Sequence, residues 1–126
     1  MKITAVLTVR NEGAFLLEWL AHHRACGVTD FLVFSNDCDD GTDAMLDRLA
    51  EMGWLVHLRN PGPHGEGPQW AALKQADRHA LVRGADWVLP LDIDEFVNVH
   101  VGDRTIPALL AALPEATAIP LTWRVF

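Results

Sequence analysis

Three acidic side chains stand together in the segment 92–96 (DIDEF), directly after the apolar run 87–91. Residues two apart in an extended segment point to the same side, so Asp92 and Asp94 can share one ligand. Two carboxylates in one place repel each other unless a cation or a proton lies between them. Carboxylate oxygens suit Mg²⁺ or Mn²⁺, which keep water and phosphate oxygens in their remaining positions. The segment therefore predicts a Mg²⁺ or Mn²⁺ site formed by Asp92 and Asp94.

The alternative interpretation of these acids is a solvated turn at the end of a strand. Apolar residues precede the acids, and Phe96 follows them directly. Core residues therefore frame the segment on both sides, which favours the metal site over the solvated turn.

Polar clusters also follow three other apolar runs. They are Arg10, Asn11 and Glu12 after residues 3–9, Asn36 and Asp37 after residues 31–34, and Gln69 beyond the Gly/Pro-rich loop 59–68. Ligands of an open α/β sheet bind beyond the carboxyl ends of its strands. We therefore expect these clusters and the acidic segment to share one rim of a sheet, where Asn36 or Asp37 can face a base or ribose.

Structural roles are the alternative for individual members of these clusters. Residues 10–12 can form a turn and the start of a helix, where the negative charge of Glu12 would interact favourably with the helix dipole. Either Asp39 or Asp40 is expected to cap the next helix. Segment 36–47 only half resembles a calcium loop, because the third ligand place holds Cys38 and the last holds Asp47.

Histidines and tryptophans give weaker signals. His22 and His23 are neighbours that point to different parts of a helix, so core packing is favoured over a shared metal. Tryptophans are usually core residues, although Trp70 beside Gln69 is also a candidate platform for a sugar.

The spacing of apolar residues predicts alternating strands and helices. Strands are expected at 3–9, 31–34, 54–58 and 87–91, and helices from Phe15 to His23, Met45 to Met52 and Gln69 to Arg83. Gly53 and Gly84 are expected to end the second and third helices, Gly53 in a left-handed cap. Such alternation indicates an α/β fold with a doubly wound, largely parallel sheet.

Later and finer features are less regular. The third helix is expected to bury a stripe of Trp70, Leu73, Ala76, His79 and Ala80. Beyond Phe96 we expect a short strand at 97–99, a helix at 106–113 and a strand at 118–126.

Bulk composition excludes some classes of partner. A length of 126 residues with 50% hydrophobic residues fits one domain, and we expect residues 1–126 to be the N-terminal part of a longer protein. The net charge of −7 argues against nucleic acid, and a phosphate ligand would need a cation to mediate its binding. Cys26 and Cys38 fit reduced core thiols. With neither a signal peptide nor a transmembrane run, a cytoplasmic protein is expected.

Three motifs resemble the GT-A-fold glycosyltransferases of the family 2-like group, over nearly all of residues 3–126. They are residues 8–12 (TVRNE), 35–42 (SNDCDDGT) and 87–96 (WVLPLDIDEF), the last being similar to the family's Asp-x-Asp segment in its Asp-Glu-Phe variant. The resemblance implies a nucleoside-diphosphate sugar as donor, with a UDP-sugar favoured, and a saccharide or other hydroxyl acceptor.

By this resemblance Arg10, Asn11, Glu12, Asn36 and Asp37 would bind the nucleoside side of the donor, and Asp92 and Asp94 would bind the metal. Gln69 would reach the donor from beyond the Gly/Pro-rich loop. Many members have two consecutive acids after the second strand where this chain has Ser35 and Asn36, so the base contact is open between Asn36 and Asp37.

The reaction implied is displacement at the anomeric carbon of the donor sugar by an acceptor hydroxyl. The metal would neutralise charge on the leaving diphosphate. An inverting enzyme also needs a carboxylate base, and we find no candidate for it before Phe126.

The alternatives are a non-catalytic nucleotide-binding module and a Mg²⁺-dependent phosphohydrolase, whose acids would follow the first strand and not the fourth. The first turn is not rich enough in glycine for a dinucleotide-binding domain.

Overall fold

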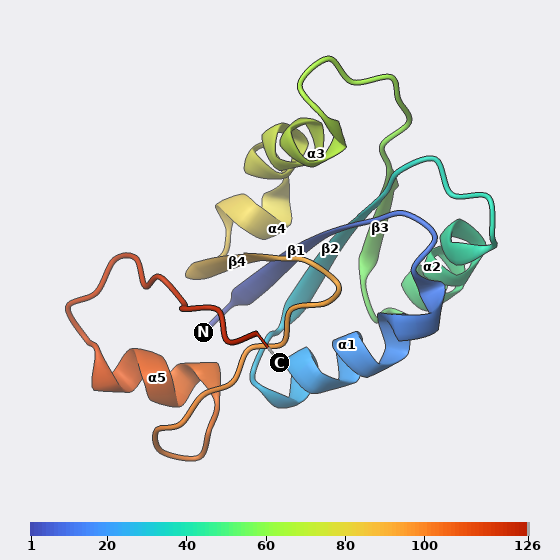
Figure 1. Ribbon diagram of the computed structural model, residues 1–126. Helices are drawn as coiled ribbons and strands as arrows, with labels where there is room; N and C mark the ends of the chain where they lie inside the picture. The colour runs from blue at the N-terminus through green and yellow to red at the C-terminus, as the bar shows by residue number, and fades with distance from the viewer. Residues whose placement is uncertain (126) are drawn as a thin grey trace.

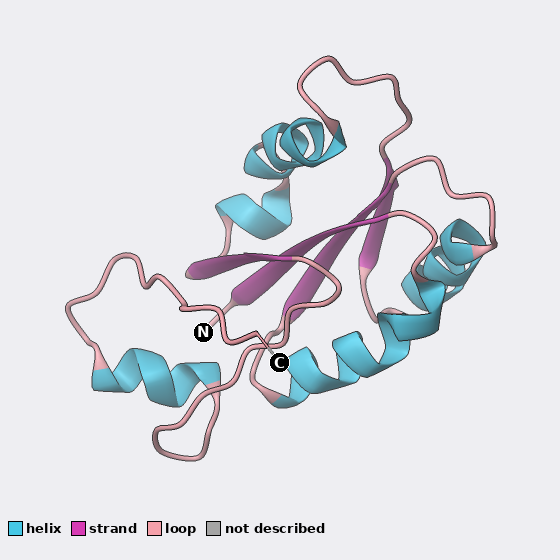
Figure 2. Ribbon diagram, viewed as in Figure 1, coloured by secondary structure: helices cyan, strands magenta, loops and turns pink. Residues whose placement is uncertain are grey.

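A computed structural model describes residues 1–125, which form a parallel sheet with helices on both of its faces (Figures 1 and 2). The strands are β1 (Ile3–Val9), β2 (Asp30–Ser35), β3 (Val56–Arg59) and β4 (Trp87–Leu91). The helices are α1 (Gly13–Ala25), α2 (Thr42–Glu51), α3 (Pro68–Asp77), α4 (Ala80–Arg83) and α5 (Ile106–Ala112). The predicted α/β fold with a doubly wound parallel sheet is confirmed.

The order of strands in the sheet is β3-β2-β1-β4, and every neighbouring pair is parallel. The chain moves outward from β1 to β3 and then returns to the other side of β1 for β4. Parallel pairing brings the carboxyl ends of all four strands to one edge of the sheet. The order of strands therefore reverses between β1 and β4, which is where ligands of such sheets bind.

Helices cover both faces of the central strands, whereas Val88 and Pro90 of the edge strand β4 are exposed. One face packs residues such as Leu7 and Val9 of β1 against Leu16 and Trp19 of α1, with buried residues of α2 and α5 in the same cluster. The opposite face packs Val6 and residues of β2 against α3 and α4 (Figure 1). A central strand buried on both faces explains why β1 is nearly continuously apolar.

The third predicted helix is broken, which corrects the expectation of one helix from Gln69 to Arg83. His79 has an extended backbone (φ −80°, ψ 143°), and its Nδ1 accepts a hydrogen bond of 3.1 Å from the backbone N–H of Leu81. The side chain thus caps α4 in the middle of the predicted helix. Gly84 ends α4 as predicted.

The predicted buried stripe on this helix was wrong at Trp70, which is 63% exposed, and at Ala80, which is also exposed. Ala72 and Ala76 are the fully buried residues of α3, and Leu73 packs beside them. Small side chains here let α3 lie close to the sheet, and the indole turns outward.

Several element ends differ from the prediction. Strand β3 begins at Val56, two residues after the predicted start, and follows Gly53, which has the expected left-handed backbone (φ +81°). Residues 97–99 do not form a strand, although Val97 and Val99 are buried, because side chains of α1 bind both backbone polar groups of Val97. Residues 118–125 are not a strand, and Phe126 lies outside the described residues.

Within residues 1–125, every helix is too short or too polar to cross a lipid bilayer.

Candidate functional site

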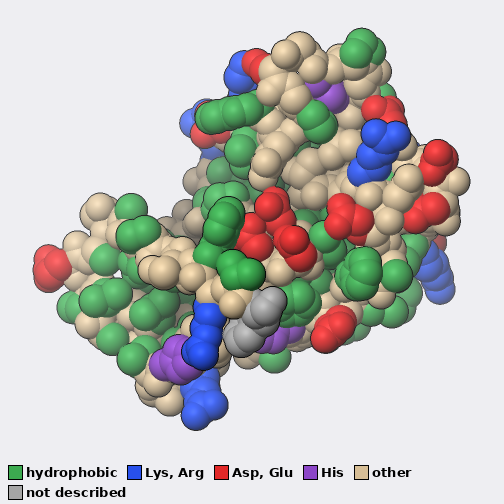
Figure 3. Space-filling view, in the orientation of Figure 1, with side chains coloured by type: hydrophobic (Ala, Val, Ile, Leu, Met, Phe, Trp, Pro, Cys, Tyr) green, Lys and Arg blue, Asp and Glu red, His purple; other side chains and the backbone are tan. Residues whose placement is uncertain are grey.

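The acidic segment forms a turn immediately after β4. Asp92 and Asp94 are exposed and Glu95 is half-buried, and each can offer a carboxylate oxygen within 4.8 Å of the other two. The backbone N–H of Glu95 donates to the carbonyl of Asp92 at 3.1 Å and closes the turn. Figure 3 shows acidic side chains gathered near the middle of this face of the molecule.

Glu95 was not singled out as a ligand in the sequence, although it stands beside Asp94. Burial raises the pKa of Glu95, and a hydrogen bond with Asp92 and the charges of Asp92 and Asp94 raise it further. Three carboxylates held this close favour any cation that neutralises them. Hard oxygen donors in this number fit Mg²⁺ or Mn²⁺, with coordination positions left for phosphate oxygens.

Gln69 lies beside this turn, as its sequence position predicted. It is in the first turn of α3, and its Nε2 donates to Oδ1 of Asp92 at 3.3 Å. The structure therefore brings the end of the Gly/Pro-rich loop to the carboxylates that follow β4.

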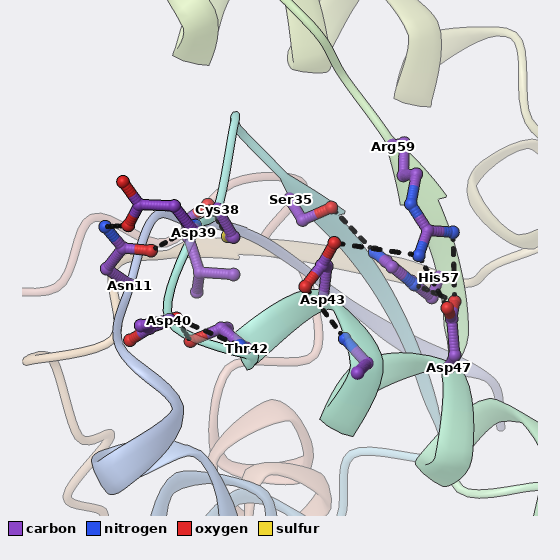
Figure 4. A network of polar contacts seen from close by, with 12 residues as sticks. Asn11, Ser35, Cys38, Asp39, Asp40, Thr42, Asp43, Asp47, His57 and Arg59 are labelled. Carbon is purple, nitrogen blue, oxygen red and sulfur yellow. Dashed lines mark hydrogen bonds and ion pairs between the residues drawn. The ribbon is translucent and has the colours of Figure 1, made fainter.

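The cluster after β1 is linked to the loop after β2. Asn11 has a left-handed backbone (φ 54°), and its Nδ2 donates to Oδ1 of Asp39 at 2.8 Å (Figure 4). In return, the backbone N–H of Asp39 donates to Oδ1 of Asn11 at 3.0 Å. Glu12 accepts a long bond of 3.4 Å from the backbone of Arg10, and Arg10 is exposed on the rim. The side chain of Asn11 thus holds two rim loops together.

Asn36 and Asp37, which the sequence could not separate, differ in exposure. Asn36 is only 8% exposed, and its Oδ1 accepts from Nδ2 of Asn60 at 2.8 Å. Asp37 is exposed with a left-handed backbone (φ 48°), and its Oδ2 accepts from the backbone N–H of Gly62 at 3.0 Å. Asp37 is therefore the one of the two that a ligand on the rim can contact.

Asn60, which the sequence did not single out, directly follows β3 and is 1% exposed. Its Nδ2 also donates to the carbonyl of Pro68 at 3.0 Å, and its Oδ1 accepts from Nε2 of Gln75 at 2.8 Å. Buried amide groups are costly unless they are bonded, so this chain of amides fixes the loop firmly. An Asn beside a proline reads only as a turn signal, and its bonds depend on residues far along the chain.

The N-cap residue of α2 is Gly41, which makes no side-chain cap bond, and the expected bond to the start of the helix comes from Asp40 and not from Asp39. Oδ1 of Asp40 accepts from the backbone N–H of Thr42 at 2.9 Å and from its hydroxyl at 2.6 Å (Figure 4). These bonds lower the pKa of Asp40. The Thr42 hydroxyl in turn accepts from the backbone N–H of Gly13 at 3.0 Å, which joins the starts of α1 and α2.

A second polar network links β2, β3 and α2 (Figure 4). Oγ of Ser35 lies 2.7 Å from Nε2 of His57, and Nδ1 of His57 lies 2.8 Å from Oδ1 of Asp47. Arg59 donates to both oxygens of Asp47, and these contacts with Arg59 and His57 lower the pKa of Asp47.

The order Ser-His-Asp is also that of a hydrolytic triad. Here Ser35 is 3% exposed and the side chain of His57 is 1% exposed. A substrate carbonyl cannot approach such a buried hydroxyl, so this network is structural. It ties the carboxyl ends of β2 and β3 to α2, beside the rim.

Comparison with known proteins decides the family. A model of glycosyltransferase family 92 matches residues 6–126, nearly the whole chain. The chain belongs to glycosyltransferase family 92. The sequence resembled GT-A-fold glycosyltransferases of the family 2-like group; the GT-A-like glycosyltransferase is confirmed, and the family that matches is family 92.

Plant members of family 92 are similar to this chain. It is 28% identical over 98 residues to a family 92 protein of Ricinus communis, covering 75% of this chain and 16% of the relative. It is 29% identical over 106 residues to one of Oryza sativa subsp. japonica, covering 81% and 17%. This family 92 chain therefore spans about one sixth of the length of these curated relatives.

Two solved structures share the fold. The crystal structure of S. aureus TarS is 20% identical with a TM-score of 0.59, covering 91% of this chain and 20% of TarS. Mannosyltransferase PcManGT from Pyrobaculum calidifontis, in complex with GDP-Man and Mn²⁺, is 18% identical with a TM-score of 0.54. That match covers 74% of this chain and 27% of PcManGT. Sequence identities this low show that the two structures share the fold of the family 92 chain, and no more than the fold.

Proposed function

We propose that this chain binds the nucleoside-diphosphate sugar donor of a metal-dependent glycosyltransferase, which moves the sugar to an acceptor hydroxyl. The single observation that carries the proposal is the gathering of three carboxylates where the strand order reverses, in a chain of a glycosyltransferase family. The Mn²⁺ and GDP-Man of the structurally similar mannosyltransferase support it.

Asp92 and Asp94 would hold Mn²⁺ or Mg²⁺, with Glu95 as a third carboxylate within reach. The cation would neutralise charge on the leaving diphosphate. Gln69, through its bond to Oδ1 of Asp92, fixes one of these carboxylates and reaches toward the donor.

Residues after β1 and β2 would bind the nucleoside. Asp37 is exposed and can accept a hydrogen bond from the ring N–H of uracil or of guanine. A UDP-sugar is the donor we propose first, and a GDP-sugar is the alternative that the titration below compares with it. Arg10 and Glu12 lie on the same rim after β1 and would contact the ribose or phosphates. Asn11 and Asn36 would act by shaping the rim, since their side chains bond to Asp39 and Asn60.

The proposal is tested by calorimetric titration of UDP, with GDP in parallel, in the presence and absence of Mn²⁺. We expect binding that requires Mn²⁺ and that is lost in Asp94→Asn. Glu18→Gln is the matched control, because it removes one negative charge from an exposed position on α1. Equal affinity with and without Mn²⁺ would remove the metal from the proposal.

Heat stability gives an independent measure. A ligand at 100 times its dissociation constant adds about 2.7 kcal/mol to the free energy of unfolding. We expect UDP to give this gain only when Mn²⁺ is present, in addition to any gain from Mn²⁺ itself. A donor that is bound but never transferred to any hydroxyl by the protein would instead favour a nucleotide-binding module.

A further inference from the structure

Trp19 of α1 bonds to the backbone on both sides of Asp94. This residue is fully buried, and its Nε1–H is shared between the carbonyls of Asp92 and Glu95 at 3.1 Å each. The carbonyl of Asp92 also accepts the N–H of Glu95 that closes the turn. One indole N–H thus directs two carbonyls of the turn inward, while the carboxylates of Asp92 and Asp94 stay exposed.

His23, one helical turn further along α1, binds the far end of the same segment. It is fully buried, and its Nε2 accepts from the backbone N–H of Val97 at 3.2 Å. Because a backbone N–H can only donate, the ring proton lies on Nδ1, which donates to the carbonyl of Trp19 at 2.8 Å. The tautomer of His23 is therefore set by its two partners. Neighbouring His22 donates to the carbonyl of Val97 at 2.7 Å.

Packing restricts the rings that make these bonds. The rings of Trp19 and His23 lie 4.4 Å apart, and His23 stacks on Phe96 with an interplanar angle of 25°. The ring of Trp19 also packs edge-on with Phe31 of β2, with 5.8 Å between the ring centroids. The donor and acceptor atoms that hold the turn are therefore fixed by the core of the sheet.

We propose that Trp19 and His23 are positioning residues that hold the turn 92–97 in the conformation that gathers its three carboxylates. This role rests on the proposed function, because the turn carries the carboxylates of the proposed cation site. Groups that orient metal ligands commonly change metal affinity by roughly 10 to 100-fold when they are removed. Here the orienting groups act through the backbone, because they bond to carbonyl and N–H groups around Asp94 and leave its side chain free.

Trp19→Phe tests the first contact, because it keeps an aromatic ring while it removes the N–H donor together with part of the indole. Binding of Mn²⁺ alone is measured by electron paramagnetic resonance, and we expect a loss of affinity of roughly 10 to 100-fold. Trp54→Phe is the matched control, since Trp54 lies on the surface under Arg24. Unchanged Mn²⁺ affinity in Trp19→Phe would overturn the proposal.

The second contact is tested by rescue. His23→Gln keeps an acceptor for the N–H of Val97, whereas His23→Leu removes it. We expect Gln to retain most of the Mn²⁺ affinity and Leu to lose it. Val33→Ala truncates a fully buried core side chain in β2. It distinguishes an effect on the conformation of the turn from a general loss of stability. It should lower the free energy of unfolding while leaving Mn²⁺ affinity intact, and an equal loss of affinity in Val33→Ala would contradict a positioning role.

A measurement without metal separates this inference from the proposed function. Amide hydrogen exchange in metal-free protein should rise at least roughly tenfold at Glu95 in Trp19→Phe and at Val97 in His23→Leu, and stay unchanged at Val33. If wild-type protein takes up no Mn²⁺, the cation site fails, while this pattern of exchange would still establish that α1 holds the turn. Unchanged exchange at Glu95 and Val97 would overturn that role.

Discussion

Acidification should destabilise the protein through the buried ring of His23. Desolvation by burial lowers the pKa of His23 from 6.5 to about 4, although the bond to the carbonyl of Trp19 opposes the shift. The unfolded chain therefore takes up a proton near pH 6.5 that the folded chain refuses until about pH 4. Stability that is present above pH 6.5 is lost as the pH falls through this window.

The size of the loss follows from the same two pKa values. At pH 5 the unfolded imidazole is almost fully protonated and the folded one is almost fully neutral. Each tenfold difference in protonation corresponds to about 1.4 kcal/mol, so the free energy of unfolding should fall by about 2 kcal/mol between pH 7 and pH 5. His23→Gln, which has no titrating ring, should lack this part of the decrease.

Urea unfolding followed by tryptophan fluorescence measures the effect. Wild-type protein and His23→Gln are compared at both pH values with a chelator present, so that the other titrating groups cancel in the difference. Parallel pH dependence of the two proteins would refute the reasoning. Proton NMR titration of the His23 ring gives its folded pKa directly, and a value near 6.5 would refute it as well.

Three further predictions concern the loops that shape the rim. Asp40→Ala removes the bonds to Thr42 at the start of α2 and should lower the free energy of unfolding in urea by about 1 kcal/mol. An unchanged urea concentration at the midpoint of unfolding would show that water replaces these bonds. Asn60→Ala strands the buried Oδ1 of Asn36 and should cost about 1 to 3 kcal/mol and speed limited proteolysis of the loop 61–67; unchanged proteolysis would place the anchor elsewhere. Gly53→Ala meets no atom within 4 Å, so only its left-handed backbone is strained, and a loss of about 1 kcal/mol is expected; a neutral effect would mean that the backbone relaxes.

The fold and the rim could be predicted from sequence because their signals are local. Each strand is a short apolar run, and each run ends in polar residues, so parallel pairing alone brings those residues to one edge. Helix breaks are harder, because His79 has ordinary helical spacing in the sequence. The helix that follows the break is held by a residue far away in the sequence, since the hydroxyl of Thr4 in β1 donates to the carbonyl of Leu81 in α4 at 2.7 Å.

Contacts between distant residues account for what the sequence did not reveal. Trp19 reads as an ordinary core residue, because nothing nearby indicates that its N–H will meet carbonyls more than 70 positions later. Asn60 and Gln75 likewise bond across a loop. The separation of Asn36 from Asp37 needed the path of the backbone, which buries one side chain and leaves the other in solvent.

The amide of Asn60 also has a consequence for how this part of the fold can vary. It joins β3 to the carbonyl of Pro68, so the two ends of the Gly/Pro-rich loop are fastened together by one side chain. Doubling the length of a flexible loop with fixed ends costs only about 0.6 kcal/mol of closure entropy. Insertions and deletions between residues 61 and 67 can therefore change the length and side chains of the loop at the rim, while β3 and α3 keep their positions. We expect related chains to differ most in length at this loop.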